Sequence, residues 1–254
     1  MSNISGLICD PYDRKTRLSP ALLALLPFIF LCISLFPEIQ STWSTIWGLV
    51  VYCGSIMLLV HVGRNRGKAL ELSLFQEWGG KPSVAMLRHC DTRLAQAEKN
   101  RYRAFLERKV PKLKLASPEE EEKSLAQADD GYESATTWLL TQTRDPKRFR
   151  LIFQENINYG FHRNIRGLKP IAIILDIIVI TILLIWCISL WTGDVLSTLN
   201  SIGIYGQITG ILVIPHLLLF LFLIKRDWIR VPAEAYARQL LAACDHLDKS
   251  QSDR

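Results

Sequence analysis

The sequence lacks the signatures by which most enzymes can be identified. None of the motifs G-x-x-x-x-G-K-S/T, H-E-x-x-H, G-x-S-x-G or G-x-G-x-x-G occurs in its 254 residues. Six cysteines are scattered without a C-x-x-C pair, and three of them, Cys32, Cys53 and Cys187, lie in apolar stretches. We therefore expect no catalytic site, no metal centre, no cofactor and no disulfide framework.

Lysine and arginine are absent from two short segments, residues 37–42 and 192–201. All 30 of them fall into three other segments: Met1–Leu18, Gly63–Lys169 and Lys225–Arg254. Cytoplasmic segments of membrane proteins are enriched in Lys and Arg. The distribution therefore predicts that the two short segments lie outside, and that both termini and the long central segment are cytoplasmic.

Apolar residues are abundant in this chain: 49% of its residues are hydrophobic, and many of them are clustered in long segments. Four apolar segments are each close to the roughly 20 residues needed to cross a bilayer: Ser19–Phe36, Trp43–Val62, Ile171–Trp191 and Ile202–Ile224. We predict an all-α membrane protein with four transmembrane helices and a helical cytoplasmic domain inserted between helices 2 and 3. Its parts are a cytoplasmic lead (1–18), helices 1 and 2 (19–62), the basic helical domain (63–169), helices 3 and 4 (170–224) and a cytoplasmic C-terminal helix (225–254).

Local patterns within the cytoplasmic parts predict further helices. Thr92–Lys109 carries apolar residues on one broad face. Ser117–Glu120 matches a capping box that starts a helix running to Thr143, and the carboxylate run Glu119–Glu122 is interpreted as its solvated first turn. Pro232–Leu247 is amphipathic and is expected to pack on the cytoplasmic domain or on a neighbouring subunit.

Asp176 is the most informative residue within a predicted span. An ionisable group in hydrocarbon is costly and usually faces a bundle interior or an aqueous cavity. In a pore it would favour cations. The alternative is a position near the headgroups, where Asp176 pairs with Lys169 or Lys225.

The fourth predicted span is small and polar for a membrane helix. Gly206 and Gly210 form a G-x-x-x-G pattern that permits close approach between helices, and Gln207 and His216 would be costly against lipid. These residues predict a helix that lines a pore or contacts another subunit. Simple packing of small residues is the alternative.

Basic and aromatic residues interleave in the cytoplasmic domain. Arginine and lysine bind phosphates, while exposed bases stack on aromatic rings or guanidinium planes. We predict a nucleotide-binding or oligonucleotide-binding site formed by Lys81, Arg88, Arg101, Tyr102, Arg103, Arg144, Lys147, Arg148 and Arg150. The alternative is that the cations set topology and touch anionic lipids, while aromatic residues such as Tyr102 belong to the core.

Two segments, Trp78–Pro82 with Leu87–His89 and Phe153–Asn164, resemble parts of small bacterial inner-membrane proteins. The layout of a helical domain between two helix pairs resembles the membrane effectors of Hailong-type anti-phage systems. In that family a nucleotidyltransferase partner makes oligodeoxynucleotides that hold an oligomeric channel shut. The resemblance therefore implies a role in antiviral defence, a short single-stranded DNA ligand and a nucleotidyltransferase partner.

We accordingly expect a multi-pass protein of the bacterial inner membrane that forms a homo-oligomer, expected to be a tetramer. It would conduct ions under control of a nucleotide or short oligonucleotide, with the direction of that control left open. One alternative is a non-channel adaptor that recruits a cytoplasmic partner. Another is a transporter that uses Asp176 and His216.

Overall fold

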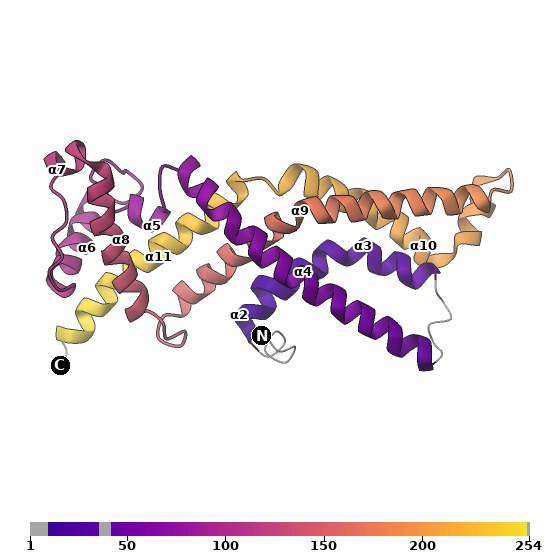
Figure 1. The fold of residues 1–254 in the computed structure, drawn as a ribbon, viewed down its shortest axis with the longest axis horizontal. Helices are drawn as coiled ribbons and strands as arrows, with labels where there is room; N and C mark the ends of the chain where they lie inside the picture. The colour runs from indigo at the N-terminus through magenta and orange to yellow at the C-terminus, as the bar shows by residue number, and fades with distance from the viewer. Residues whose placement is uncertain (1–9, 36–41, 253–254) are drawn as a thin grey trace. The chain divides into compact units, whose positions relative to one another are not determined.

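The computed structural model describes residues 10–35 and 42–252, with side chains described for residues 10–35 and 53–248 (Figure 1). Every regular element in this part of the chain is helical. The elements are α2 (Pro11–Asp13), η1 (Arg14–Leu18), α3 (Ser19–Leu35), α4 (Thr42–Glu77), α5 (Pro82–Ala85), α6 (Gln96–Lys109), α7 (Pro118–Lys123), α8 (Leu125–Gln142), α9 (Arg150–Ser189), α10 (Val195–Leu218), η3 (Leu219–Leu223) and α11 (Asp227–Ser252).

The chain divides into two compact units. The first, which we call the membrane unit, comprises Met1–Leu70 and Gly160–Trp228. The second, the polar unit, comprises Glu71–Tyr159 and Ile229–Arg254. The polar unit thus combines the middle of the chain with its C-terminal helix.

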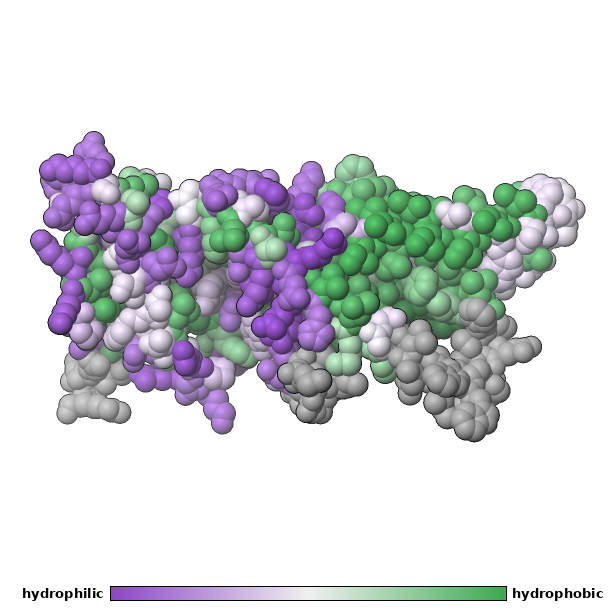
Figure 2. Space-filling view, viewed as in Figure 1, coloured by the Kyte–Doolittle hydropathy of each residue, from purple (hydrophilic) through white to green (hydrophobic). Residues whose placement is uncertain are grey.

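Three helical stretches are long and apolar enough to cross a membrane, namely Pro11–Leu35, Arg150–Ser189 and Val195–Leu223. They cover most of the predicted first, third and fourth spans, and their length and composition fit a membrane protein. Figure 2 shows hydrophobic side chains gathered over α9 and α10, where the exposed residues include Ile177, Ile185 and Ile211. The predicted second span, Trp43–Val62, begins in α4 among residues whose side chains lie outside the described part, so it stays a prediction.

Within the membrane unit, α4 and α9 cross at glycines. A Cβ atom on Gly167 would lie 2.7 Å from the backbone nitrogen of Gly67 and 2.9 Å from the carbonyl oxygen of Gly63. Backbone atoms cannot move aside as a flexible side chain can, so this crossing requires glycine. Next to it, the Asn164 amide donates a hydrogen bond to the Thr16 carbonyl at 2.7 Å, which fixes α9 against η1.

The core of the polar unit joins α5, α6, α8 and α11. Leu87, Leu106, Tyr132 and Leu139 are fully buried in one cluster with the apolar face of α11. That face consists of Leu240, Leu241, Cys244 and Leu247, all of them buried. Of the two partners predicted for the C-terminal helix, the structure shows the one within the same chain, and the helix is longer than expected.

Two predicted helices have different bounds in the structure. The helix expected from Thr92 begins only at Gln96. The capping box is confirmed, because the Ser117 hydroxyl accepts from the Glu120 backbone and the Glu120 carboxylate accepts from the Ser117 backbone. A single helix from there to Thr143 is wrong, because Ser124 adopts φ −152° and ψ 89°, which separates α7 from α8.

We expect Gly167→Ala to destabilise the membrane unit, because its new methyl group must push α4 away from α9. Gly54→Ala is the matched control, since Gly54 is also helical and a Cβ there meets nothing within 4 Å. Alanine is the better helix former by about 1 kcal/mol, so this control should be neutral or slightly stabilising. Thermal unfolding of the purified protein in detergent measures both. Equal melting temperatures for the two variants would contradict the close crossing.

Candidate functional site

The membrane unit contains a buried pair of ionisable residues, Asp176 on α9 and His216 on α10. Nδ1 of His216 lies 3.0 Å and 2.9 Å from the two carboxyl oxygens of Asp176. Asp176 is 0% exposed and His216 is 8% exposed. The other ring nitrogen, Nε2, lies 2.8 Å from the carbonyl oxygen of Leu23 on α3. The imidazole of His216 therefore links its own helix, α10, to both α9 and α3.

The hydrogen bonds of His216 fix the proton content of this pair. The Leu23 carbonyl can only accept, so Nε2 must carry a proton. Nδ1 then either donates to an ionised Asp176 or accepts from a protonated one. In both arrangements one hydrogen bond joins Nδ1 to the Asp176 carboxyl group.

A proline explains why the Leu23 carbonyl is available to His216. In an α-helix this carbonyl would accept from the backbone N–H four residues later. That position is Pro27, which lies within α3 and has no N–H. The imidazole of His216 thus supplies the donor that the helix lacks. The sequence contains this signal, since a proline within a span leaves one carbonyl in need of a partner.

The alternative prediction that Asp176 pairs with a lysine near the headgroups is wrong. Its partner is His216, while Nζ of Lys169 donates to the carbonyls of Leu221 and Ile224 at 3.0 Å and 3.1 Å. These carbonyls lie in and just after η3, where the backbone needs donors because the helix ends. Asp176 therefore faces the interior of the helix bundle.

The remaining residues predicted for α10 differ in their surroundings. Gly206 is buried, and a Cβ there would clash with Cγ2 of Ile202 in the same helix and lie 3.3 Å from the Ser34 hydroxyl of α3. Among the described residues, no atom lies within 4 Å of a Cβ position on Gly210, so it takes no part in this packing between α10 and α3. Gln207 donates to the Leu199 carbonyl at 3.0 Å, across a break in the helix at Gly203, where φ is 73°.

In the polar unit, two of the predicted ligand-binding arginines are held by carboxylates. Arg88 donates to both oxygens of Asp129, at 2.8 Å and 2.6 Å, and to the Gly79 carbonyl. Arg101 donates to both oxygens of Asp245 on α11, at 2.7 Å and 2.8 Å. Such two-point pairs leave little of either guanidinium available to a phosphate.

Tyr102 and Arg103 lie inside the polar unit. Tyr102 is 3% exposed, and burial raises its pKa to about 12. The buried Arg103 donates to the carbonyls of Leu87 and Ala116 and to the Tyr132 hydroxyl. In this conformation neither residue is accessible to a nucleotide, which matches the alternative that Tyr102 belongs to the core.

The accessible cations of the predicted set lie mostly in one turn between α8 and α9. Arg144, Lys147, Arg148 and Arg150 are all exposed there, and we call them the basic turn. Lys81 is partly exposed, with Glu133 at 3.7 Å. A pocket of about 290 Å³ adjoins the basic turn; it is lined by Leu140, Thr143, Arg144, Pro146, Ile152, Phe153, Asn156 and Tyr236.

A buried polar network that the sequence did not reveal holds the loop between α5 and α6. Glu121, only 5% exposed, accepts from the backbone nitrogen of His89 and from the Tyr132 hydroxyl. Lys99, 0% exposed, donates to the carbonyls of Arg88, His89 and Asp91. The interpretation of Glu119–Glu122 as wholly solvated is thus wrong for Glu121.

The electrostatics of this network follow from burial and hydrogen bonding. Burial lowers the pKa of Lys99. Burial also works to raise the pKa of Glu121, but the hydrogen bonds from Tyr132 and from the backbone of His89 and Cys90 outweigh it, so this pKa lies below its usual value. The network is satisfied within the protein, and we assign it a structural role.

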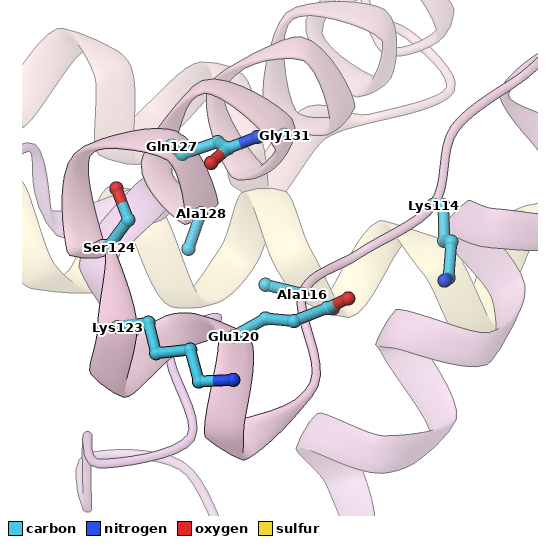
Figure 3. A pocket seen from close by; sticks show the side chains of 8 residues that line it. All are labelled: Lys114, Ala116, Glu120, Lys123, Ser124, Gln127, Ala128 and Gly131. Atoms are coloured by element: carbon cyan, nitrogen blue, oxygen red, sulfur yellow. The ribbon is translucent and has the colours of Figure 1, made fainter.

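A second pocket of the polar unit, of about 350 Å³, involves none of the predicted residues. Figure 3 shows the side chains that line it, and they come from the segment before α7, from α7 and from α8. Its charged members are Lys114, Glu120 and Lys123. Because a carboxylate accompanies the two ammonium groups and aromatic residues are absent from its lining, this pocket suits a nucleotide less well than the pocket beside the basic turn.

Comparison with known proteins adds no functional assignment to these sites. No protein-family model, curated protein or solved structure matches the chain. The resemblance to Hailong-type effectors therefore stays a prediction from architecture. Among the described residues, no group of three or more His, Cys, Asp or Glu is placed to hold a metal ion.

We expect Asp176→Ala to lower the stability of the protein by about 3 kcal/mol or more, because it leaves a buried imidazole without its partner. Asp176→Asn should cost less, since its side-chain amide can donate to Nδ1 of a neutral imidazole while Nε2 still donates to the Leu23 carbonyl. Asp130→Ala, at an exposed position of α8, is the control for loss of a carboxylate. Melting temperatures in detergent report all three, and equal values for Asp176→Ala and Asp130→Ala would refute the buried pair.

Glu121 should contribute to stability in a pH-dependent way. Because its folded pKa lies below the unfolded value of about 4.3, its contribution is complete above that value and is lost as the pH falls through the folded pKa. The stability difference between wild type and Glu121→Gln should therefore be largest near pH 7 and shrink below about pH 4. Glu122→Gln, exposed beside it, should show little difference at either pH. Unfolding curves at pH 7 and at about pH 3 test this, and a constant difference would contradict it.

Proposed function

We propose that this chain is the subunit of an oligomeric ion channel in the bacterial inner membrane, controlled by a nucleotide or short single-stranded DNA and acting in anti-phage defence. The observation that carries the channel proposal is the Asp176–His216 pair. Ionisable residues buried within membrane-spanning helices are rare and usually mark a functional site. The same pair ties α9 and α10 to α3 through the Leu23 carbonyl, so a rearrangement of these helices has to break it.

In the proposed mechanism the described conformation is the one locked by this pair. Opening would separate His216 from Asp176 and expose polar groups to a water-filled passage between subunits. Gly210 and Gln207 of α10 support such a passage, since Gly210 is not used for packing within the chain and Gln207 is only half-buried. A helix with these groups is costly against lipid and less costly against another subunit or water.

The basic turn and the pocket beside it are the proposed ligand site. Arg144, Lys147, Arg148 and Arg150 would contact phosphates. The adjoining pocket is lined by Phe153 and Tyr236, and aromatic rings of this kind provide stacking surfaces for bases. This assignment narrows the predicted set, because Arg88, Arg101, Tyr102 and Arg103 are occupied by contacts within the polar unit.

A ligand controls a pore only when it binds the open and closed states with different affinity. α9 is one continuous helix from Arg150, in the basic turn, to Ser189. It therefore carries both the start of the proposed ligand site and Asp176. The proposal retains the four-span topology with both termini in the cytoplasm, a tetrameric assembly and a nucleotidyltransferase that supplies the ligand.

A proton-coupled transporter is the second candidate, and the contact between Asp176 and His216 favours it. A neutral carboxyl–imidazole pair that shares one proton is the kind of group through which a proton could pass. In that case flux should depend on a pH gradient, and Asp176→Asn should abolish it. A channel should pass ions without a gradient of protons, and Asp176→Asn should change its opening rather than remove its conductance.

The ligand proposal is tested by binding of a fluorescent single-stranded oligonucleotide to the purified protein. We expect simultaneous replacement of Arg144, Lys147, Arg148 and Arg150 by Gln to abolish binding, because the phosphates lose their cations. Lys114→Gln with Lys123→Gln is the control, since it neutralises exposed cations of the other pocket. Wild-type affinity should fall steeply with salt, as expected when phosphate contacts release counterions.

The channel itself is tested by ion flux from proteoliposomes with and without the oligonucleotide. We expect the ligand to change the flux of the wild type and to leave that of the fourfold Gln variant unaltered. Absence of flux in every condition, together with normal insertion, would point to the adaptor alternative. Equal binding by the fourfold variant and the wild type would refute the assignment of the basic turn.

A further inference from the structure

A groove in the membrane unit lies between α4 and α9, close to their glycine crossing. Its volume is about 300 Å³, and it is lined by Arg66, Ala69, Leu70, Arg166, Gly167 and Pro170. Four of these six residues are apolar or glycine, and the other two are arginines. Because Gly167 brings the two backbones into contact, the arginines flank the groove from two different helices.

Neither arginine has a counter-ion within the part of the chain that the structure describes. Arg66 is exposed. Arg166 is partly buried, and its Nε atom is inaccessible to solvent and has no hydrogen-bond partner. The charged neighbour that acts on Arg166 is a further cation, Arg226. A guanidinium that is partly removed from water without a carboxylate is unfavourable on its own, so the site calls for an anion.

The position of the groove indicates where this anion comes from. Arg66 lies one helical turn beyond Val62, the end of the predicted second span. Arg166 lies one turn before Pro170 and the apolar run of the third span. Arginines at such positions meet the phosphates of lipid headgroups. Pro170, on the membrane side of Arg166, adds an apolar surface suited to the start of an acyl chain, which a soluble phosphate compound would not use.

We propose that this groove binds one anionic phospholipid, with its headgroup phosphate between Arg66 and Arg166 and the start of an acyl chain beside Pro170. The guanidinium groups would donate charge-assisted hydrogen bonds to the phosphate oxygens. The lipid would then fill the space beside the glycine crossing and hold α4 and α9 together. This site is separate from the basic turn and does not depend on the proposed ligand control.

Native mass spectrometry of the detergent-solubilised protein, titrated with dioleoyl-phosphatidylglycerol, tests the site. The wild type should retain one lipid per subunit. Arg66→Gln with Arg166→Gln should weaken this binding at least about tenfold, because each of the two arginines near the anionic headgroup contributes several-fold to the affinity for the lipid. Lys68→Gln is the matched control, since it removes an exposed charge from the same turn of α4 without lining the groove.

Two further measurements, with a single variant and with a second lipid, test whether the arginines bind the anionic headgroup. Arg66→Gln alone alters an exposed side chain, so it should weaken binding without affecting folding. Dioleoyl-phosphatidylcholine in place of phosphatidylglycerol should bind the wild type much more weakly. Equal retention of phosphatidylglycerol by wild type and double variant would overturn the proposal, as would equal binding of the two lipids. Displacement of the lipid by millimolar inorganic phosphate would assign the groove to soluble phosphates instead.

Discussion

The structure depends on one electrostatic constraint, which is that an ionisable side chain removed from water needs a partner. The constraint acts in both units. In the membrane unit it brings Asp176 and His216 together. In the polar unit it surrounds Glu121 and Lys99 with hydrogen bonds. Since leaving any of these groups unpaired would cost several kcal/mol, their partners fix how the surrounding helices pack.

Prolines and glycines determine where the helices of the membrane unit can meet. Pro27 removes a donor from α3, so the Leu23 carbonyl accepts from His216 instead. Gly167 allows α9 to touch the backbone of α4, and Gly206 allows α10 to lie against Ser34 of α3. Each contact relies on the absence of an atom, either an amide hydrogen or a Cβ. Any functional movement of these helices would have to break or change these contacts.

The basic residues of the polar unit fall into two groups: some are held by contacts within the fold, and others are exposed. Arg88, Arg101 and Arg103 are bound by carboxylates, carbonyls or a hydroxyl and so stabilise the fold. The cations of the basic turn remain exposed beside an aromatic-lined pocket. Arginine fits both roles, because its planar group with five donors matches a carboxylate as well as a phosphate. Interleaved basic and aromatic residues in this chain therefore include contacts within the fold as well as exposed cations.

Local sequence patterns were enough to predict the all-helical class, three of the apolar helices, the capping box at Ser117 and the apolar face of the C-terminal helix. These features depend on local composition and on the helical period, which a single chain displays directly. Only the tertiary structure decided the partners of Asp176, Glu121 and Arg101. The residues of these pairs are 40, 11 and 144 positions apart, and contacts over such separations depend on how the helices pack, which local sequence patterns do not encode.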